Sequence, residues 1–386
     1  MRLHTAGFVT LANHWLVTYR GGEKVLAEFR RLFPSAPLAS LVCKRGEIPE
    51  DILGARVITS PLQAVPGAWK YYKALLPLHP WAFGRLAAPV GTRLVLSSDA
   101  AMVKGLRLPE GARQVCYCHS PPRYLWDLQD DYTEGLGWFK RRVFDWTVPR
   151  ARAFDHEAAQ RVDRFIANSH FVAERIRRSY GRDAAVIYPP VAVDDFLPDR
   201  PSGDFYLLVT QLTPYKRADL AVTAFTRMGK KLVVIGEGSE FETLKKIAGP
   251  TVQLLGRQPF KIVKDHFERC RAFLYPQIED FGITAVEAQA AGKPVIAFRA
   301  GGALETVIDG ETGLFFDEQT PESLADAVRR FEQLAPSNRQ LATSFSPAAC
   351  RANAERFRPE RFRAEIKAFL ETHYPDLFAS YHWPDR

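Results

Sequence analysis

Long apolar runs are missing from this sequence of 386 residues. None approaches the roughly 20 consecutive apolar residues that a membrane-spanning helix needs. The N-terminus also lacks the uninterrupted apolar stretch and the cleavage site of a secretory signal. These absences favour a cytoplasmic protein that is at most peripheral to the inner face of the cell membrane.

Cysteine is scarce, and none of the five residues forms a Cys-x-x-Cys pair. An odd number leaves one thiol over in any disulfide scheme, so we expect reduced core cysteines at positions 43, 116, 118, 270 and 350. No Asp-x-Asp element follows an expected strand, and no nucleic-acid-binding motif occurs. The sequence therefore gives no signal for a metal site of this type or for a nucleic-acid partner.

Acidic residues are few in the first half of the chain. Residues 1–190 contain 27 Lys and Arg against 17 Asp and Glu, a net charge of +10, whereas residues 191–386 contain 25 against 27, a net charge of −2. Within the basic half, residues 69–85 and 138–152 interleave aromatic, basic and aliphatic side chains. This mixture is typical of a water–membrane interface, although core helices also contain aromatic residues. An anionic membrane surface is an expected partner, and buried aromatic helices are the alternative.

Short apolar runs alternate with amphipathic helical patterns after residue 204. The expected strands there are 205–210, 231–235, 252–255, 272–275 and 295–298. The first half is less regular, with strands expected at 7–11, 38–42, 94–97, 114–117 and 164–167. Such alternation predicts an α/β fold with two doubly wound parallel sheets, which bind ligands outside the carboxyl ends of their strands.

A change in composition separates the two expected domains. Residues 191–203 are rich in proline and acidic residues and have no amphipathic period, which is typical of a linker. We expect one domain over residues 1–190 and another over 204–347. Helices over about 348–386 are expected to return and pack on the first domain.

Residues 279–287 carry two carboxylates eight positions apart, across a glycine-bearing loop that opens into a helix. Glu279 follows an expected buried strand, and the backbone N–H groups of Gly282, Ile283 and Thr284 would lie at the positive end of that helix. This arrangement can hold an anionic or sugar-bearing ligand. The alternative is a capping box between Thr284 and Glu287, which needs no ligand.

The order of several motifs resembles glycosyltransferase family 4, over nearly the whole chain. The motifs are Tyr-Arg-Gly-Gly-Glu-Lys-Val at 19–25, His-Ser-Pro-Pro-Arg-Tyr-Leu-Trp at 119–126, Ala-Asn-Ser-His at 167–170, Pro-Tyr-Lys-Arg at 214–217, residues 279–287, and Gly-Gly-Ala-Leu-Glu at 301–305. The wording at 118–126 and 280–292 is most similar to the branch of GDP-mannose-dependent mannosyltransferases. The resemblance implies the GT-B fold, with two Rossmann-like domains facing a cleft, and retention of the sugar's anomeric configuration.

The resemblance also implies roles for individual residues of the donor site. Glu287 would hold the nucleotide ribose, Glu279 the donor sugar, and Lys216 with Arg217 the diphosphate. Phe281, Gly282, Ile283 and Thr284 complete the expected donor site of the second domain, and Gly21 and Gly22 approach the diphosphate or the acceptor. The donor, GDP-mannose, is a substrate rather than a cofactor. Its sugar would pass to a glycan or a lipid-linked saccharide.

In the first domain, the resemblance places His119 near the donor sugar, so that His119, Glu279 and Lys216 are the expected catalytic residues. A lone histidine is more often structural, and the glycine pair is also compatible with an ordinary tight turn. Trp15 and Tyr19 are expected to contact the acceptor. No metal is expected, because cationic side chains and a helix N-terminus take its place.

Two positions depart from the family pattern. Gln211 replaces an arginine usually found five residues before the lysine, and Asn13-His-Trp15 replaces a frequent His-Asp-Trp. The first departure removes one charge from the phosphate site. Two alternatives therefore stay open beside transfer: a sugar-nucleotide epimerase of the same architecture, and a noncatalytic subunit that binds a sugar nucleotide.

Overall fold

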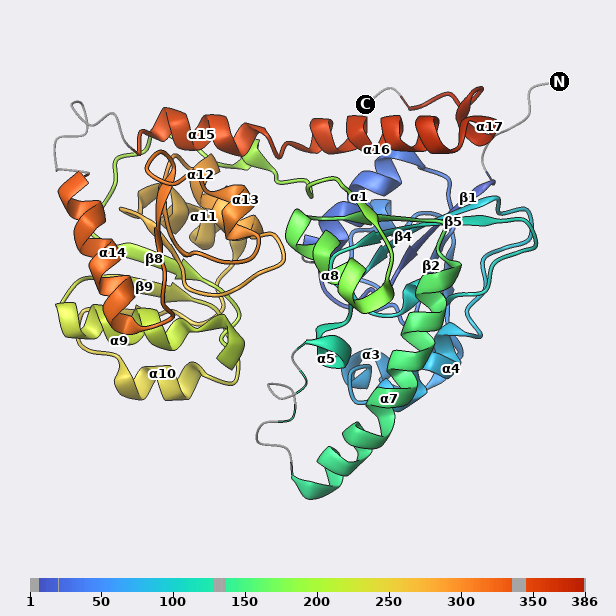
Figure 1. The fold of residues 1–386 in the computed structure, drawn as a ribbon, viewed down its shortest axis with the longest axis horizontal. Helices are drawn as coiled ribbons and strands as arrows, with labels where there is room; N and C mark the ends of the chain where they lie inside the picture. Colours follow the sequence, from blue (N-terminus) through green and yellow to red (C-terminus); the bar gives the residue numbers. More distant parts are fainter. Residues whose placement is uncertain are drawn as a thin grey trace. The chain divides into compact units, whose positions relative to one another are not determined.

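The protein is described by a computed structural model over residues 7–19, 21–127, 129, 133, 137–334 and 345–384. The chain forms two compact units (Figure 1). The first consists of Met1–Pro190 together with Glu360–Arg386, and the second of Val191–Pro359. The second unit is thus inserted into the sequence of the first.

A parallel sheet forms the centre of the first unit and has seven strands in its described part, in the order β3-β2-β1-β4-β5-β6-β7. The strands are β1 (Val9–Asn13), β2 (Leu38–Ser40), β3 (Val57–Thr59), β4 (Leu94–Asp99), β5 (Arg113–Cys118), β6 (Arg164–Ala167) and β7 (Ala184–Val186). The strand order reverses between β1 and β4, where Val9 pairs with Leu94. Doubly wound sheets bind ligands at such a switch point.

Helices cover both faces of this sheet (Figure 1). They are α1 (Gly21–Leu32), α2 (Glu50–Leu53), α3 (Ala68–Tyr71), α4 (His79–Phe83), α5 (Arg123–Trp126), α7 (Trp138–Arg161), α8 (His170–Tyr180), α16 (Pro359–His373) and α17 (Pro375–Phe378), with 3-10 turns η1 (Pro61–Ala64), η2 (Leu76–Leu78) and η3 (Val103–Gly105). Successive strand residues point to opposite faces, so Leu94 and Leu96 join one core cluster and Val95 joins another. Burial on both faces explains why β4 begins as a continuous apolar run.

The second unit has a parallel sheet of six strands in its described part, in the order β10-β9-β8-β11-β12-β13. Its strands are β8 (Tyr206–Val209), β9 (Leu232–Ile235), β10 (Val252–Leu254), β11 (Phe273–Tyr275), β12 (Val295–Phe298) and β13 (Gly313–Phe316). Its helices are α9 (Ala218–Met228), α10 (Phe241–Ile247), α11 (Phe260–Arg269), α12 (Ile283–Ala290), α13 (Ala303–Thr306), α14 (Pro321–Leu334) and α15 (Pro347–Glu355), with 3-10 turns η4 (Val193–Asp195) and η5 (Pro214–Lys216). Here the order reverses between β8 and β11.

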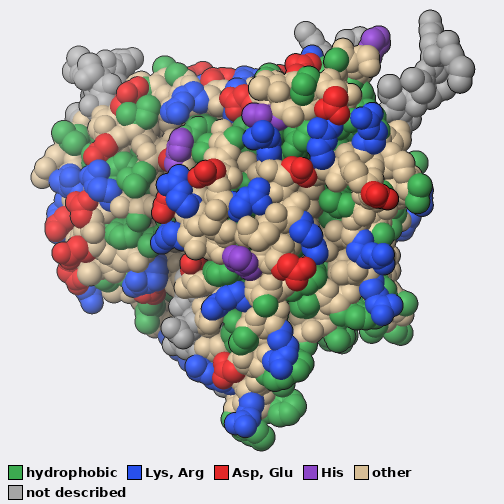
Figure 2. Space-filling model, turned by 45° about the vertical axis from the view of Figure 1, so that its right-hand side comes forward, with side chains coloured by type: hydrophobic (Ala, Val, Ile, Leu, Met, Phe, Trp, Pro, Cys, Tyr) green, Lys and Arg blue, Asp and Glu red, His purple; other side chains and the backbone are tan. Residues whose placement is uncertain are grey.

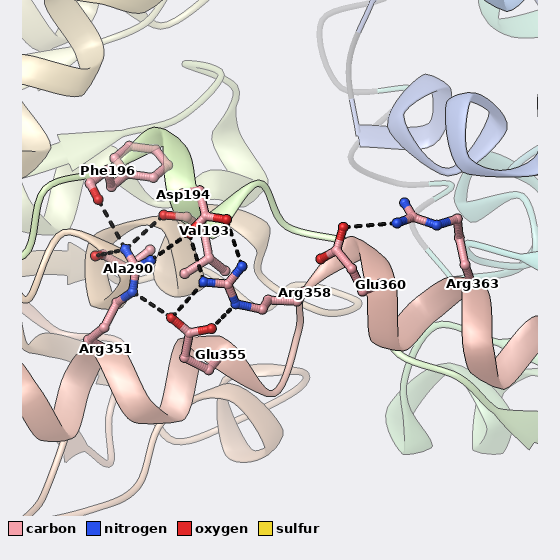
Figure 3. Close-up of polar contacts among 9 residues, drawn as sticks. All are labelled: Val193, Asp194, Phe196, Ala290, Arg351, Glu355, Arg358, Glu360 and Arg363. Atoms are coloured by element: carbon pink, nitrogen blue, oxygen red, sulfur yellow. Dashed lines mark hydrogen bonds and ion pairs between the residues drawn. The ribbon is translucent and has the colours of Figure 1, made fainter. Parts of the chain in front are cut away.

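The segment expected to be a linker is tied into the second unit. Asp194 forms ion pairs with Arg351 on α15 and with Arg358, at 2.9 and 2.6 Å (Figure 3). Arg351 also donates to the carbonyls of Val193, at 2.9 Å, and of Phe196, at 3.0 Å. Residues 191–203 therefore belong to the second unit. Arg351 binds the backbone of this segment, and Arg351 and Arg358 both bind the carboxylate of Asp194.

The C-terminal helices are divided between the units. α15 packs on α12 in the second unit, whereas the sequence placed all residues after about 348 on the first domain. α16 joins the first unit, where Phe362, Ile366 and Leu370 are fully buried in the same cluster as Val9. Their spacing of four residues puts them on one face of the helix. No helix among the described residues is both long enough and apolar enough to cross a membrane.

The fold class predicted from the sequence is confirmed: each unit has a doubly wound parallel sheet. All ten expected strands are present, with ends that shift by up to two residues. Three strands were not predicted, namely β3, β7 and β13. β3 and β7 are three-residue strands at the two edges of the first sheet, and neither has a fully buried residue.

Candidate functional site

Two loops of the second unit meet at the switch point of its sheet, one after β8 and one after β11. Lys216 ends the 3-10 turn η5, and its side-chain ammonium forms an ion pair with the carboxylate of Glu279. Both side chains are mostly shielded from solvent. The structure thus brings together two of the three residues predicted to be catalytic, although 63 positions separate them in the sequence.

Arg217 follows in the left-handed backbone region, with φ 52°, and caps the N-terminus of α9. Its guanidinium lies 3.2 Å from the carboxylate of Asp219, in the first turn of the same helix. A cation at a helix N-terminus opposes the helix dipole, so a neighbouring carboxylate lowers the cost of placing it there. Gln211 is exposed in the same loop, and its carbonyl accepts a bond from Thr213.

The helix after Glu279 begins at Ile283, and its N-cap is Gly282 with φ 104°. No side chain caps it, so the capping box between Thr284 and Glu287 is wrong: Thr284 is the second helical residue, two positions after the N-cap. The first amides of a helix have no partner within the helix. The backbone N–H groups of Ile283 and Thr284 are therefore placed to donate to an anion.

A second glycine pair supports the loop that carries Glu279. The amide of Gly302 donates to the carbonyl of Glu279 at 2.8 Å. A Cβ on Gly301 would lie 2.5 Å from that carbonyl oxygen, and one on Gly302 would lie 2.4 Å from the backbone of Phe281. The two loops approach so closely that only glycine fits, which explains the glycines of the motif at 301–305.

Two other residues predicted to bind the donor are buried. The ring of Phe281 packs edge-on against Phe357, with ring centroids 5.3 Å apart, so Phe281 contributes to the core of the second unit. Glu287 is buried in the second turn of α12.

In the first unit, polar groups gather at the carboxyl ends of β1, β4 and β5. His119 follows β5, and its Nε2 lies 2.8 Å from the hydroxyl of Ser98, near the end of β4. Its backbone is held by two bonds, from its N–H to the carbonyl of Asp99 at 2.8 Å and from the side chain of Asn168 to its carbonyl at 3.0 Å. His119 is thus fixed in place at the switch point of the first sheet.

Gly21 and Gly22 open α1 directly beside this histidine. A Cβ on Gly22 would lie 3.6 Å from Nε2 of His119. Trp15 packs on Tyr72, with ring centroids 4.8 Å apart, and is partly buried. Tyr19 is exposed and precedes the helix. Of the first-unit residues predicted for the site, the structure therefore groups His119 with the glycines.

A buried ion-pair network lies behind His119. The ammonium of Lys104 lies 2.5 Å from Asp155 on α7 and 3.3 Å from Asp99 at the end of β4. Burial alone would lower the pKa of Lys104, but the carboxylates of Asp155 and Asp99 raise it. Asp155 also accepts bonds from Trp126, at 2.9 Å, and Tyr180, at 2.8 Å. The network joins α7, α5 and α8 to the strand next to the histidine.

Two protein-family models match the chain in succession. The first is described as Glycosyltransferase Family 4 and matches residues 19–195; the second is described as Glycosyl transferases group 1 and matches residues 197–345. The chain belongs to glycosyltransferase family 4. The earlier interpretation from the six motifs is confirmed at this level.

Curated relatives of this family 4 chain match part of it. An uncharacterised glycosyltransferase of Methanocaldococcus jannaschii is 27% identical over 213 residues, which cover 52% of this chain and 60% of the relative. The GDP-mannose-dependent alpha-(1-6)-phosphatidylinositol monomannoside mannosyltransferase of Mycobacterium tuberculosis is 30% identical over 216 residues, 47% of this chain and 55% of that protein. The chain thus spans little more than half the length of these relatives.

The solved structure of HepE of Anabaena in complex with UDP matches along nearly the whole length of this family 4 chain. It has a TM-score of 0.67 and 16% sequence identity, and the match covers 94% of this chain and 99% of HepE. HepE has also been solved with UDP-glucose. At 16% identity the similarity establishes the GT-B fold alone.

Sequence reasoning missed the groups that hold His119 in place. Ser98 and Asn168 fix His119, and Lys104 with Asp155 supports them from the core. Asn168 could have been found because it lies in the motif at 167–170. Ser98, Lys104 and Asp155 lie in none of the recognised motifs. Within the described ranges, no group of three or more His, Cys, Asp or Glu side chains is placed to hold a metal ion.

Proposed function

We propose that this protein transfers mannose from GDP-mannose to a hydroxyl group of a glycan or a lipid-linked saccharide, with retention of the anomeric configuration. The observation that carries the proposal is the ion pair between Lys216 and Glu279 beside the uncapped start of α12, in a chain of glycosyltransferase family 4. An ammonium, two free backbone amides and a carboxylate are the groups that a sugar diphosphate requires.

Each group has a role in this proposal. Lys216 has three N–H donors, so it can bind a phosphate oxygen while it keeps its bond to Glu279. The amides of Ile283 and Thr284 bind the diphosphate at the positive end of the helix dipole. Glu279 binds hydroxyls of the donor sugar, and Glu287 binds those of the ribose.

The reaction breaks the bond between the sugar's anomeric carbon and the diphosphate oxygen, and it forms a bond from that carbon to the acceptor oxygen. The acceptor's proton passes to the departing phosphate on the same face of the sugar. Negative charge grows on the diphosphate as the bond breaks, so Lys216 and α12 stabilise the transition state more than the ground state. In this proposal His119 binds the donor sugar and does not act as a base.

The proposed nucleotide base, guanine, is inferred from one of the relatives. The mycobacterial mannosyltransferase is named as GDP-mannose-dependent, while HepE was solved with UDP and UDP-glucose. The sequence at 280–292, which is most similar to the GDP-mannose-dependent branch, favours GDP-mannose. A thermal unfolding series with GDP, UDP, ADP and their sugar conjugates tests this choice, because a ligand at 100 times its dissociation constant adds about 2.7 kcal/mol of stability. A shift with UDP compounds alone would reject GDP-mannose.

A transfer assay then tests the site. We expect Lys216→Met and Glu279→Gln each to lower turnover at least tenfold. The exposed pair Lys231 and Asp204, joined at 2.6 Å in the same unit, provides the control: Lys231→Met should leave turnover unchanged. Equal rates for all three variants would refute the site assignment.

Two other functions are tested as well, because Gln211 lacks the positive charge of the arginine that is usual at this position of the phosphate loop. Conversion of the donor sugar without any acceptor would identify an epimerase. Nucleotide binding without transfer to any of a panel of glycan and lipid-linked acceptors would favour a noncatalytic binding subunit.

A further inference from the structure

The first turns of α7 expose large aromatic side chains to solvent. Trp138 is 79% exposed, Phe139 65% and Trp146 56%, and the first buried residue of the helix is Thr147. This beginning of α7 projects from the first unit (Figure 1). A soluble surface seldom presents such large apolar groups together without a partner.

Two of the exposed aromatic residues share one side of the helix with Val143. Phe139, Val143 and Trp146 follow one another at intervals of four and three residues, so they lie on one face. The face that packs on the first unit's core carries Phe144 and Val148 instead. The start of α7 therefore has two apolar faces, and among the described residues only the face of Phe144 and Val148 packs on the core of the first unit.

Basic residues surround the unused face. Residues 138–146 contain three basic residues and one acidic residue, a net charge of +2. Arg142 lies three positions after Phe139 on the same face, and the guanidinium of Arg150 lies 4.1 Å from the ring centroid of Trp146. Figure 2 shows hydrophobic and basic side chains gathered at the lower tip of the molecule, where Figure 1 places the start of α7.

Neighbouring elements extend the same mixture. η2 and α4 pack against α7, and they expose Leu78 and Trp81. The guanidinium of Arg85 lies 5.3 Å from the centroid of the Trp81 ring. Both aromatic–basic segments singled out in the sequence thus present exposed tryptophans with arginines stacked on them.

We propose that the start of α7, residues 138–146, docks the protein on membranes that contain anionic lipids. Tryptophan and phenylalanine partition into the boundary between headgroups and acyl chains, and arginine and lysine bind the lipid phosphates. The aromatic face and the positive charge are together on one helix, and the first 190 residues add a net charge of +10. This charge complementarity favours an anionic lipid surface over a protein partner. The inference does not depend on transferase activity.

Sedimentation with vesicles tests the proposal directly. We expect the full-length protein to bind vesicles of phosphatidylcholine containing 30% phosphatidylglycerol, and to bind pure phosphatidylcholine at least tenfold more weakly. The variant Arg141→Glu/Arg142→Glu should lose at least tenfold in binding. Its control, Arg177→Glu/Arg178→Glu, makes the same charge change at two exposed arginines of α8 and should bind nearly as the parent does.

The aromatic part of the proposal has its own test. Phe139→Ala should weaken vesicle binding at least threefold, whereas Phe260→Ala, at an exposed phenylalanine of the second unit, should have no effect. Brominated acyl chains should quench tryptophan fluorescence of the parent, and much less that of Trp138→Phe/Trp146→Phe. Equal losses in the paired variants, or quenching that is unchanged in the double variant, would overturn the proposal. So would binding to a protein or a nucleic acid by this face without any binding to vesicles.

Discussion

The two units hold the loops at the carboxyl ends of their strands by different means. In the first unit, side chains do so: Asp99 accepts bonds from three backbone amides, and Lys104 joins it to Asp155 from another helix. These charges are almost fully buried. The loops of the first unit therefore depend on a few polar side chains that pair only when the fold is complete.

In the second unit, close packing between backbone segments holds these loops. A Cβ on Gly236 would lie 1.8 Å from the carbonyl oxygen of Thr210, and one on Gly238 would lie 2.0 Å from that of Leu212. Gly301 and Gly302 approach the loop of Glu279 in the same way. These loops are thus held by buried charges in the first unit and by close backbone packing in the second.

Removing the buried lysine of the first unit should have the largest effect. Lys104→Met leaves Asp99 and Asp155 without their counter-ion, and breaking a buried pair in this way costs about 3–5 kcal/mol. All seven tryptophans lie outside residues 191–359, so tryptophan fluorescence during urea unfolding reports the first unit alone.

The surface pair of Lys231 and Asp204 provides the contrast, because Lys231→Met should cost less than about 1 kcal/mol in the second unit. Circular dichroism follows that variant. Similar losses for both lysines would mean that burial does not set the strength of the first unit's network.

The glycines of the second unit permit a matched pair of substitutions. Gly301 and Gly310 both have left-handed backbones, with φ 63° and 77°, so alanine costs about 1–2 kcal/mol at either. Only at Gly301 does the new Cβ meet a neighbour, the carbonyl oxygen of Glu279 at 2.5 Å; nothing lies within 4 Å at Gly310. Gly301→Ala should therefore lose a further 1–3 kcal/mol, about the cost of overpacking.

Thermal unfolding followed by circular dichroism measures both variants. Gly301→Ala should also weaken nucleotide binding, because it displaces the loop of Glu279. If the two alanines cost the same, close packing of the two backbones is not what fixes this loop.

A smaller effect is expected from acid on the first unit. Burial lowers the pKa of His79 to about 4, below the ordinary value of about 6.5 expected in the unfolded chain. Between pH 6.5 and pH 4 only the unfolded chain takes up a proton at this histidine. The free energy of unfolding is therefore highest above pH 6.5 and decreases as the pH falls toward 4. By pH 5 the loss amounts to about 2 kcal/mol.

Urea unfolding followed by tryptophan fluorescence at pH 7 and pH 5 measures this loss. His79→Gln should reduce it, and His156→Gln, at an exposed position of α7, should not. An identical pH dependence in the parent and in His79→Gln would exclude this histidine as the cause.

The strands of both units could be predicted because parallel strands buried on two faces are continuous apolar runs. β12 was predicted to the residue for this reason. The edge strands β3 and β7 were missed since each has three residues and is covered only in part. The start of α12 has no side-chain signal in the sequence, because its cap is a glycine without a side-chain bond.

The residues proposed to bind the donor were easier to single out in the sequence than the residues that support them. Glycines after strands and the spacing of Glu279 from Glu287 are visible in the sequence, and they pointed to the start of α12. Lys104 has no such signal: a lysine in a loop is usually exposed, and its partner Asp155 lies 51 positions away. The pairing exists only after β4 and α7 have packed.

The insertion of the second unit into the first has a consequence for synthesis of the chain. The apolar layer around Val9 is completed by Phe362, Ile366 and Leu370 of α16, which a ribosome reaches only after all of residues 191–359. At roughly 5–20 residues per second, those three side chains arrive roughly 10–30 seconds after the first unit's last strand. The second unit can fold as it leaves the ribosome, while the core of the first unit is completed only once α16 has been made.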